Sequence, residues 1–207
     1  MSVWGRIFAA MYDRMLAASE EAGLADRRAD VIAAARGRVL EIGAGTGNNL
    51  RHYPPDGIDE LVLTEPEAPM ARRLEDRVAG AARDVQVLRA GADELPFADA
   101  SFDTVVSTLV LCTVPDPDRA LAEIRRVLAP GGRLLFLEHV RNDDPGRARW
   151  QDRITPIWRH VAHGCHPNRE TPRLIAEAGF AVSDVDTGHF PKGPKVVQPL
   201  VSGVATR

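Results

Sequence analysis

The sequence lacks the features of a secreted or membrane-spanning protein. Only two of its 207 residues are cysteines, Cys112 and Cys165, and no leader with charged, apolar and small-residue regions stands at its start. A secreted disulfide scaffold is therefore not indicated, and a reducing cytoplasm is the expected location. No apolar run approaches the roughly 20 residues that a membrane-spanning helix needs.

An excess of basic residues is also missing. The formal net charge is -3, which provides no broad positive face for the phosphates of a nucleic acid, so we expect no nucleic-acid partner. Internal repeats and low-complexity tracts are absent as well. Hydrophobic residues make up 44% and charged residues 27% of the chain, as in a globular protein. The oligomeric state stays open.

The first residues carry an apolar stripe at helical spacing, formed by Val3, Trp4, Ile7, Phe8, Met11 and Met15. We interpret this segment as a lid or packing helix, because it lacks the lysine-rich opposite face of a helix that lies on a membrane. Contact with a membrane surface is the alternative interpretation.

Short apolar runs alternate with helical patterns from residue 38 onward, which is typical of a doubly wound α/β protein. We predict parallel, buried strands at residues 38–42, 60–64, 85–90, 102–107 and 133–138. Helices are predicted at residues 70–82 and 118–128, and Pro130, Gly131 and Gly132 end the second one.

The pattern changes after residue 140. An amphipathic helix is predicted at residues 147–163 with an interruption at Pro156, and another at 171–178 that ends at Gly179. Residues 180–185 and 195–206 are interpreted as a closing antiparallel pair of strands. The 207 residues thus form one domain, with a helical lid at 1–35, a cofactor-binding core at 36–140 and substrate-side helices and closing strands at 141–207.

The first predicted strand leads directly into three glycines at alternate positions, Gly43, Gly45 and Gly47. Glycine permits a tight turn and a close approach of the backbone to a ligand. A dinucleotide fingerprint would need its third glycine at position 48, where this chain has Asn48. The spacing therefore favours a nucleoside ligand without a pyrophosphate and disfavours a nicotinamide-dependent oxidoreductase.

Glu65 follows the second predicted strand, about 20 residues beyond the glycines. Folds of this kind place a carboxylate there to accept hydrogen bonds from both ribose hydroxyls. We assign Glu65 this role. The other interpretation is an acidic residue that the dipole of the following helix stabilises.

Further motifs occur in order along the chain: Glu41 to Gly47 (EIGAGTG), Leu95 to Phe97 (LPF), Ser101 to Asp103 (SFD) and Leu128 to Arg133 (LAPGGR). With them the chain resembles the class I S-adenosylmethionine-dependent methyltransferases of domain type 11, over almost its whole length. The resemblance implies a Rossmann-like fold whose seven-stranded, mostly parallel sheet has the order 3-2-1-4-5-7-6, with strand 7 antiparallel and helices on both faces. It also implies S-adenosyl-L-methionine as the cofactor and S-adenosyl-L-homocysteine as its product.

Under this resemblance, the expected cofactor-binding residues are Tyr12, Glu41, Gly43, Ala44, Gly45, Thr46, Gly47, Asn49, Glu65, Pro66, Met70, Ala92, Asp93, Thr108 and Leu109. Glu41 either stabilises the turn or helps to anchor the methionyl end of the cofactor. Related sequences commonly have Gly-Asp-Ala at the adenine, where this chain has Gly91, Ala92 and Asp93. Either Asp93 or backbone groups around Gly91 and Ala92 contact the base.

The substrate side resembles the methyltransferase-like group that contains the mammalian alkyl thiol methyltransferases. The similarity lies in residues 108–115 after the fourth strand, residues 138–140 after the fifth, the pattern from Gly164 to Arg169, and a tryptophan-rich helix. It implies that substrate contacts come from Cys112, His139, Trp158 and Arg169. Cys112 is interpreted as a packing residue first, and Arg169 either binds an anionic substrate or pairs with Glu170 or Glu177.

His139 is the candidate catalytic base, because a thiol with a pKa of about 8.5 is only a few per cent ionised at pH 7. The other interpretation is a histidine that only hydrogen-bonds to residues of the site. Tyr12 and Trp4 are candidates to cover the sulfonium with their ring faces. The spacing of His160, His163, Cys165 and His166 matches no common zinc pattern, so no metal is expected there.

The sequence therefore predicts an enzyme that transfers a methyl group from S-adenosylmethionine to a small molecule, with a thiol preferred by resemblance alone. An oxygen, nitrogen or carbon acceptor, such as a phenol, an amine or a quinone, is the first alternative. A non-catalytic cofactor-binding domain is the alternative from another class, and the complete glycine loop argues against it.

Overall fold

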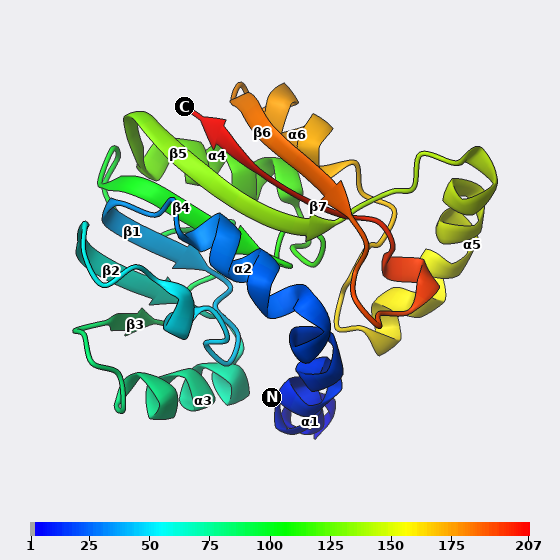
Figure 1. The fold of residues 1–207 in the computed structure, drawn as a ribbon, viewed down its shortest axis with the longest axis horizontal. Helices are drawn as coiled ribbons and strands as arrows, with labels where there is room; N and C mark the ends of the chain where they lie inside the picture. The colour runs from blue at the N-terminus through cyan, green and yellow to red at the C-terminus, as the bar shows by residue number, and fades with distance from the viewer. Residues whose placement is uncertain (1–2) are drawn as a thin grey trace.

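The computed structural model describes residues 3–207, with side chains from Ala9 onward. Figure 1 shows one twisted sheet with helices packed around it. The helices are α1 (Val3–Ser19), α2 (Ala25–Ile32), α3 (Ala68–Val78), α4 (Pro117–Val127), α5 (Pro145–Val161) and α6 (Thr171–Glu177), with the short turns η1 (Glu20–Leu24), η2 (Leu50–His52) and η3 (Lys195–Val197). The strands are β1 (Gly37–Ile42), β2 (Ile58–Thr64), β3 (Gln86–Leu88), β4 (Phe102–Thr108), β5 (Leu128–His139), β6 (Ala181–Gly188) and β7 (Leu200–Thr206).

The seven strands follow the order β3-β2-β1-β4-β5-β7-β6. All neighbours from β3 to β5 are parallel, and β7 is antiparallel to both β5 and β6. This confirms the order and the antiparallel strand 7 that the resemblance implied. The chain crosses from one half of the sheet to the other between β3 and β4. Ligands of open α/β sheets bind at the carboxyl ends of strands near such a switch.

Alternate residues of each strand face opposite layers of helices. Leu40, for example, packs with α4 and α6 on one side of the sheet, whereas Val39 packs with α2 and α3 on the other. This division follows from the period of two residues along a strand. Both faces of the central strands are buried, which explains why those strands are apolar runs in the sequence.

The helices α4 and α5 start with the same arrangement. In α4 the side chain of Asp116 accepts a hydrogen bond from the backbone N–H of Arg119 at 3.0 Å, and in α5 Asp144 accepts one from Arg147 at 2.9 Å. A proline occupies the next position in both helices, where its missing N–H carries no cost. These caps fix where α4 and α5 begin.

The predicted interruption at Pro156 is wrong, since α5 continues through that residue. A proline inside a helix removes one backbone hydrogen bond. Here the hydroxyl of Thr155 donates to the Gln151 carbonyl at 2.7 Å, and a ring nitrogen of His160 lies 2.7 Å from the Pro156 carbonyl. Such side-chain bonds to the helix backbone accompany the proline, and the helix runs on toward the cavity described below.

The largest differences between predicted and observed strand boundaries are at the starts of β5 and β7. β5 begins at Leu128 rather than at Arg133. Pro130, Gly131 and Gly132 cause an irregularity in its pairing with β4, but they do not interrupt the strand. β7 begins only at Leu200, since Lys195–Val197 form the turn η3 and Pro199 follows. The expected closing antiparallel pair is confirmed as β6 and β7.

The described part of the expected apolar stripe lies on α1, where Met11 and Met15 are about half exposed. The structure does not describe the side chains of Val3, Trp4, Ile7 and Phe8. The expected contact of the Trp4 ring with the sulfonium therefore lies outside the described part of the chain. Within residues 3–207, no helix has both the length and the apolar character needed to span a bilayer.

Candidate active site

The loop after β1 requires glycine at all three predicted positions. Gly43, Gly45 and Gly47 have φ angles of 56°, 59° and 86°, which side chains disfavour. A Cβ at Gly43 would lie 2.8 Å from the Val110 side chain, and one at Gly47 would lie 2.8 Å from Leu74. A Cβ at Gly45 would meet only the Tyr12 ring, at 3.8 Å. The backbone at Gly45 is therefore open to a ligand beneath Tyr12.

Glu65 lies at the end of β2 beside this loop. Its Oε2 accepts a hydrogen bond from the Gly45 N–H, and its Oε1 accepts one from the Glu67 N–H, both at 2.9 Å. Burial raises the pKa of this carboxyl, while the two backbone bonds oppose the shift. The side chain lines a cavity, so its remaining lone pairs are available to hydroxyl groups. The ribose role stays a prediction, and this geometry supports it.

Glu41 faces away from that cavity. Its Oε1 accepts a hydrogen bond from the Asn49 side chain at 2.9 Å, and its Oε2 accepts one from the Tyr53 hydroxyl at 2.6 Å. Burial raises its pKa to about 7, against the effect of both bonds. Of the two roles that the sequence left open, these contacts support the turn-stabilising one, because both oxygens hold neighbouring segments.

A buried arginine supports the same region. Arg28 on α2 is 3% exposed and donates through Nη1 to Asn49 Oδ1 at 3.0 Å and to Thr108 Oγ1 at 2.9 Å. Its Nε pairs with Glu20 at 2.9 Å. Arg28 was not among the predicted site residues, because arginines are rarely buried. Asn49 and Thr108 thus stabilise the glycine loop and the loop after β4, and neither residue lines the cavity.

Thr46 does not line the cavity, and it links the glycine loop to α1. Its hydroxyl donates to Asp13 Oδ1 at 2.5 Å, and Asp13 pairs with Arg77 at 3.0 Å. These bonds join α1 to the glycine loop and to α3. The first helix is thereby held over the loop, where a lid was predicted.

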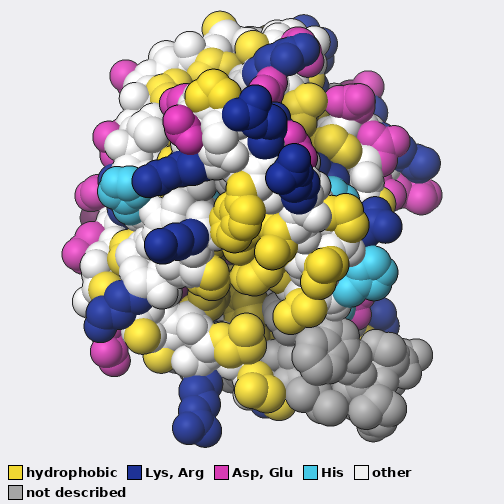
Figure 2. All heavy atoms as spheres, turned by 90° about the vertical axis from the view of Figure 1, so that its right-hand side faces the viewer, with side chains coloured by type: hydrophobic (Ala, Val, Ile, Leu, Met, Phe, Trp, Pro, Cys, Tyr) yellow, Lys and Arg dark blue, Asp and Glu magenta, His cyan; other side chains and the backbone are white. Residues whose placement is uncertain are grey.

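One cavity of about 800 Å³ opens at this end of the sheet. Among the predicted residues, it is lined by Tyr12, Gly43, Gly45, Glu65, Pro66, Met70, Ala92, Asp93, Leu109, Cys112, His139 and Trp158. The lining does not include Glu41, Ala44, Thr46, Gly47, Asn49, Thr108 or Arg169. Figure 2 views the side of the molecule on which α5 lies, and hydrophobic side chains gather there. The structure thus brings most of the predicted cofactor and substrate residues into one space.

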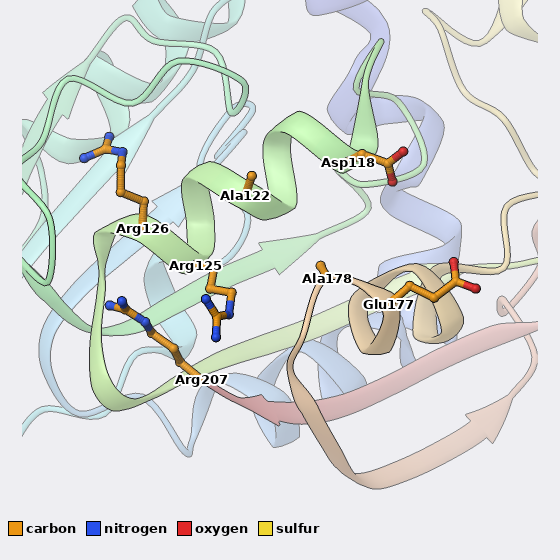
Figure 3. Close-up of a pocket in the computed structure, with 7 residues that line it drawn as sticks. All are labelled: Asp118, Ala122, Arg125, Arg126, Glu177, Ala178 and Arg207. Carbon is orange, nitrogen blue, oxygen red and sulfur yellow. The ribbon is translucent and has the colours of Figure 1, made fainter.

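A second hollow lies between α4 and α6 (Figure 3). It is lined largely by charged side chains, among them Arg125, Arg126 and Arg207, and has no lining residue in common with the larger cavity. None of the predicted site residues contributes to it.

The loop after β4 is fixed by a buried carboxylate that the sequence analysis did not single out. Glu138 Oε1 accepts hydrogen bonds from the Ser107 hydroxyl at 3.0 Å and from the backbone N–H groups of Val110 and Leu111 at 2.9 Å. Its Oε2 accepts one from the Cys112 N–H at 3.3 Å. Burial raises its pKa, and these bonds oppose the shift. Glu138 therefore determines where Cys112 enters the cavity.

Arg169 supports this loop too. Its Nη1 donates to the Leu111 carbonyl, and burial lowers its pKa. Glu170 and Glu177, its expected alternative partners, both pair with Arg173 instead. The predicted contact of Arg169 with an anionic substrate has no support from its position, since Arg169 does not line the cavity.

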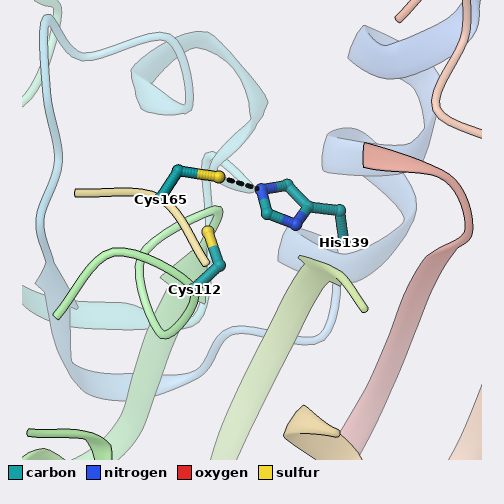
Figure 4. A group of neighbouring side chains, drawn as sticks. All are labelled: Cys112, His139 and Cys165. Carbon is teal, nitrogen blue, oxygen red and sulfur yellow. Dashed lines mark hydrogen bonds between the residues drawn. The ribbon is translucent and has the colours of Figure 1, made fainter. Parts of the chain in front are cut away.

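Cys112, His139 and Cys165 meet at the cavity wall (Figure 4). The Cys165 Sγ lies 3.2 Å from His139 Nε2, and the indole N–H of Trp158 donates to the same sulfur at 3.1 Å. The three ligand-type atoms all lie within 4.8 Å of one another, and both cysteines are free thiols. Cys165 was not among the predicted substrate residues, although it belongs to the pattern from Gly164 to Arg169 on which the resemblance partly rests.

Charge is unevenly distributed in this cluster. A hydrogen bond from Cys112 and the neighbouring His139 hold the pKa of the Cys165 thiol well below its usual range. Burial opposes the charged form of His139, but the attraction of Cys165 outweighs it and raises the pKa of the ring. Burial raises the pKa of Cys112. The cluster therefore favours a thiolate at Cys165.

The sheet order, the glycine loop and the cavity beside Glu65 define a class I methyltransferase. Its loop fits S-adenosylmethionine, since the backbone is open at Gly45 and a carboxylate lies next to it.

Comparison with known proteins identifies the family. Residues 40–136 match the family described as methyltransferase domain. Thiol S-methyltransferase TMT1B of Rattus norvegicus is 36% identical over 174 residues, which cover 82% of this chain and 70% of that protein. The ubiquinone/menaquinone biosynthesis C-methyltransferase UbiE of Ectopseudomonas mendocina (strain ymp) is 34% identical over 167 residues, 69% of this chain and 64% of that protein.

A crystal structure from Thermotoga maritima, described as a SAM-dependent methyltransferase and possible histamine N-methyltransferase, has a TM-score of 0.72. It is 26% identical, and the match covers 97% of both chains. The chain belongs to the S-adenosylmethionine-dependent methyltransferases, and S-adenosylmethionine is its cofactor. The predicted family, fold, enzyme class and cofactor are thereby confirmed.

Proposed function

We propose that this methyltransferase transfers the methyl group to the sulfur of a small thiol. The observation that carries the proposal is the group of Cys112, His139 and Cys165 in the wall of the same cavity as the glycine loop. The similarity to thiol S-methyltransferase TMT1B supports it.

The cofactor-binding side of the proposal rests on Gly43, Gly45 and Glu65. The two glycines allow the ligand to approach the backbone, and Glu65 accepts hydrogen bonds from the ribose hydroxyls. Ala92 and Asp93 also line the cavity and remain the proposed adenine neighbours. S-adenosylmethionine supplies a methyl group on a sulfonium sulfur, which leaves as a neutral thioether.

The protein's main task is alignment, because displacement at a methyl carbon requires the acceptor and the leaving group to lie in line. Such positioning contributes up to about 7–11 kcal/mol in model reactions. Apolar side chains from α1 and α5, including Leu16 and Trp158, line the cavity, and in the proposal they exclude water when the acceptor is bound. Exclusion of water also strengthens the interactions of charged groups inside.

The acceptor must also be ionised. A free thiol is only a few per cent thiolate at pH 7. In the proposal, the acceptor thiol gives up its proton at the cluster of Cys112, His139 and Cys165. His139 was predicted from the sequence as the base, and its Nε2 instead lies against the Cys165 sulfur. His139 is therefore not proposed as a single base, and the proton of the acceptor thiol leaves to solvent from beside this cluster.

The proposal is tested by turnover of S-adenosylmethionine to S-adenosylhomocysteine with panels of thiols, phenols, amines and quinones. Gly45→Arg, which fills the open backbone site, is the inactive control. Product with thiols alone supports the proposal. Product only with another class, such as quinones, keeps the methyltransferase and contradicts the thiol acceptor, while cofactor binding without any turnover favours the non-catalytic alternative.

A further inference from the structure

We propose that Cys112 Sγ, His139 Nε2 and Cys165 Sγ bind one zinc ion whose remaining coordination position faces the cavity. The three residues come from separate parts of the fold: the loop after β4, the end of β5 and the segment after α5. They are 1%, 5% and 5% exposed, and all three line the cavity. Of the four residues whose spacing was considered in the sequence, His160, His163, Cys165 and His166, this site includes only Cys165.

The distances suit zinc with small movements of the side chains. Tetrahedral zinc with Zn–S bonds of about 2.3 Å and Zn–N bonds of about 2.0 Å places its ligand atoms about 3.6–3.8 Å apart. In the structure, Cys165 Sγ and His139 Nε2 are 3.2 Å apart, and all three atoms lie within 4.8 Å of one another. A rotation of the cysteine side chains opens enough room for the ion between them.

The ligand types select a soft ion. Two thiolates and one imidazole suit zinc, and carboxylate-preferring ions such as Mg²⁺ do not favour this set. Zinc sites with three protein ligands keep a fourth position for a water or a substrate, whereas structural sites are closed by four. Here the fourth coordination position faces the cavity, because Cys112, His139 and Cys165 all line it.

The charges also balance. Two thiolates neutralise Zn²⁺ and His139 binds as a neutral ring, so no net charge is buried at the site. The indole N–H of Trp158, 3.1 Å from Cys165 Sγ, is placed to stabilise a metal-bound thiolate.

The proposed ion would explain how an acceptor thiol is ionised, which rests on the function proposed above. The acceptor R–SH binds at the open position and its proton leaves to solvent, since a coordinated thiol is deprotonated. The bound sulfur then forms a bond to the methyl carbon while the bond from that carbon to the sulfonium breaks, which gives R–S–CH₃ and S-adenosylhomocysteine. Zinc keeps its oxidation state. His139 is then a metal ligand and not the base expected from the sequence.

The test is metal binding by the full chain, kept reduced and without substrate or cofactor. The protein is purified without chelators and its metal content is measured by mass spectrometry; Zn²⁺ affinity is then measured after metal removal, in competition with a chromophoric chelator. We expect about one zinc per chain, and an affinity lowered at least about tenfold in Cys112→Ser, His139→Ala and Cys165→Ser. His160→Ala, on the exposed side of α5, is the matched control and should bind as the unchanged protein does.

Co²⁺ provides a second measurement. A sulfur-to-metal charge-transfer band that weakens in Cys165→Ser and disappears when both Cys112 and Cys165 are replaced by serine supports the site. Circular dichroism separates this result from loss of folding. Absence of zinc together with absence of that band overturns the proposal, even if thiols are methylated. One zinc per chain without methylation of any thiol supports the metal site and contradicts the proposed acceptor instead.

Discussion

The guanidinium of Arg28 donates a hydrogen bond to Thr108 Oγ1 at 2.9 Å, which joins α2 to the last residue of β4. The same nitrogen bonds to Asn49 beside the glycine loop. A single buried side chain thus positions two of the segments around the cofactor side of the cavity. Thr108 itself does not line that cavity, so its contribution is to hold Leu109 and the following loop in place.

Replacement of Arg28 by alanine should lower the free energy of unfolding by about 3–5 kcal/mol, because it leaves Glu20 without its buried partner. Urea denaturation measures the change. Arg27→Ala is the matched control: Arg27 pairs with Asp186, which is 70% exposed, so the loss should stay within about 1 kcal/mol. Equal losses in the two variants would show that the Arg28 contacts do not stabilise the fold.

Gly45→Ala should weaken cofactor binding at least about tenfold, because a Cβ occupies the open backbone site beneath Tyr12. Gly131→Ala provides the control. Both glycines have positive φ, 59° and 75°, so each substitution costs about 1–2 kcal/mol in backbone strain. A Cβ at Gly131 meets nothing within 4 Å, and Gly131 does not line the cavity.

Calorimetric titration with S-adenosylhomocysteine checks this prediction. Similar affinities for the Gly45→Ala and Gly131→Ala proteins would mean that strain alone, and not space for the ligand, determines the effect.

Glu41 should make the protein less stable as the pH rises. Its pKa in the folded protein, about 7, is above the ordinary value of 4.5, so its protonated form is favoured by folding. This contribution is complete below pH 4.5 and is lost as the pH rises through 7. Relative to Glu41→Gln, the unchanged protein should lose up to about 3 kcal/mol of unfolding free energy across that range.

Denaturation curves measured from pH 4.5 to pH 8 provide the comparison. Tyr53→Phe is a second variant: it removes a hydrogen bond that lowers the pKa of Glu41, and should move the loss of stability to higher pH. Parallel pH profiles for Glu41→Gln and the unchanged protein would contradict the assigned shift.

The fold could be predicted because its signals are local. Buried strands are apolar runs, and the glycines that need positive φ stand together after one of them. Glu65 was located for the same reason, as the first acid after a strand. Pro156 shows the limit of local rules, since side-chain bonds from Thr155 and His160 accompany a proline that was expected to interrupt α5.

The cluster in the cavity could not be predicted in the same way. Cys112, His139 and Cys165 are each more than twenty residues apart in the sequence, and only the neighbouring positions of β4 and β5 and the return of the chain after α5 bring them together. Arg28 was missed for a different reason, because arginines are rarely buried and its partners lie on other elements. The spacing of His160, His163, Cys165 and His166 in the sequence therefore gave no indication that Cys112, His139 and Cys165 come together.

Trp158 should affect binding of the proposed zinc ion, although it is not one of the proposed ligands. Its indole N–H donates to Cys165 Sγ, and loss of such an outer contact lowers metal affinity by about 10- to 100-fold. Trp158→Phe removes the donor and keeps an aromatic ring in the cavity wall, so the fall in Zn²⁺ affinity should occur without loss of the fold. The chelator competition described above measures it.

Trp150→Phe is the matched control for that experiment, because Trp150 lies on the same helix and is 43% exposed. Its zinc affinity should equal that of the unchanged protein. If Trp158→Phe also binds zinc with unchanged affinity, the N–H···S bond does not stabilise a metal-bound thiolate, and Trp158 acts only in enclosing the acceptor. In that case a change in KM for thiols, with zinc retained, would be the expected kinetic effect, since the ring packs against the cavity and not against the metal.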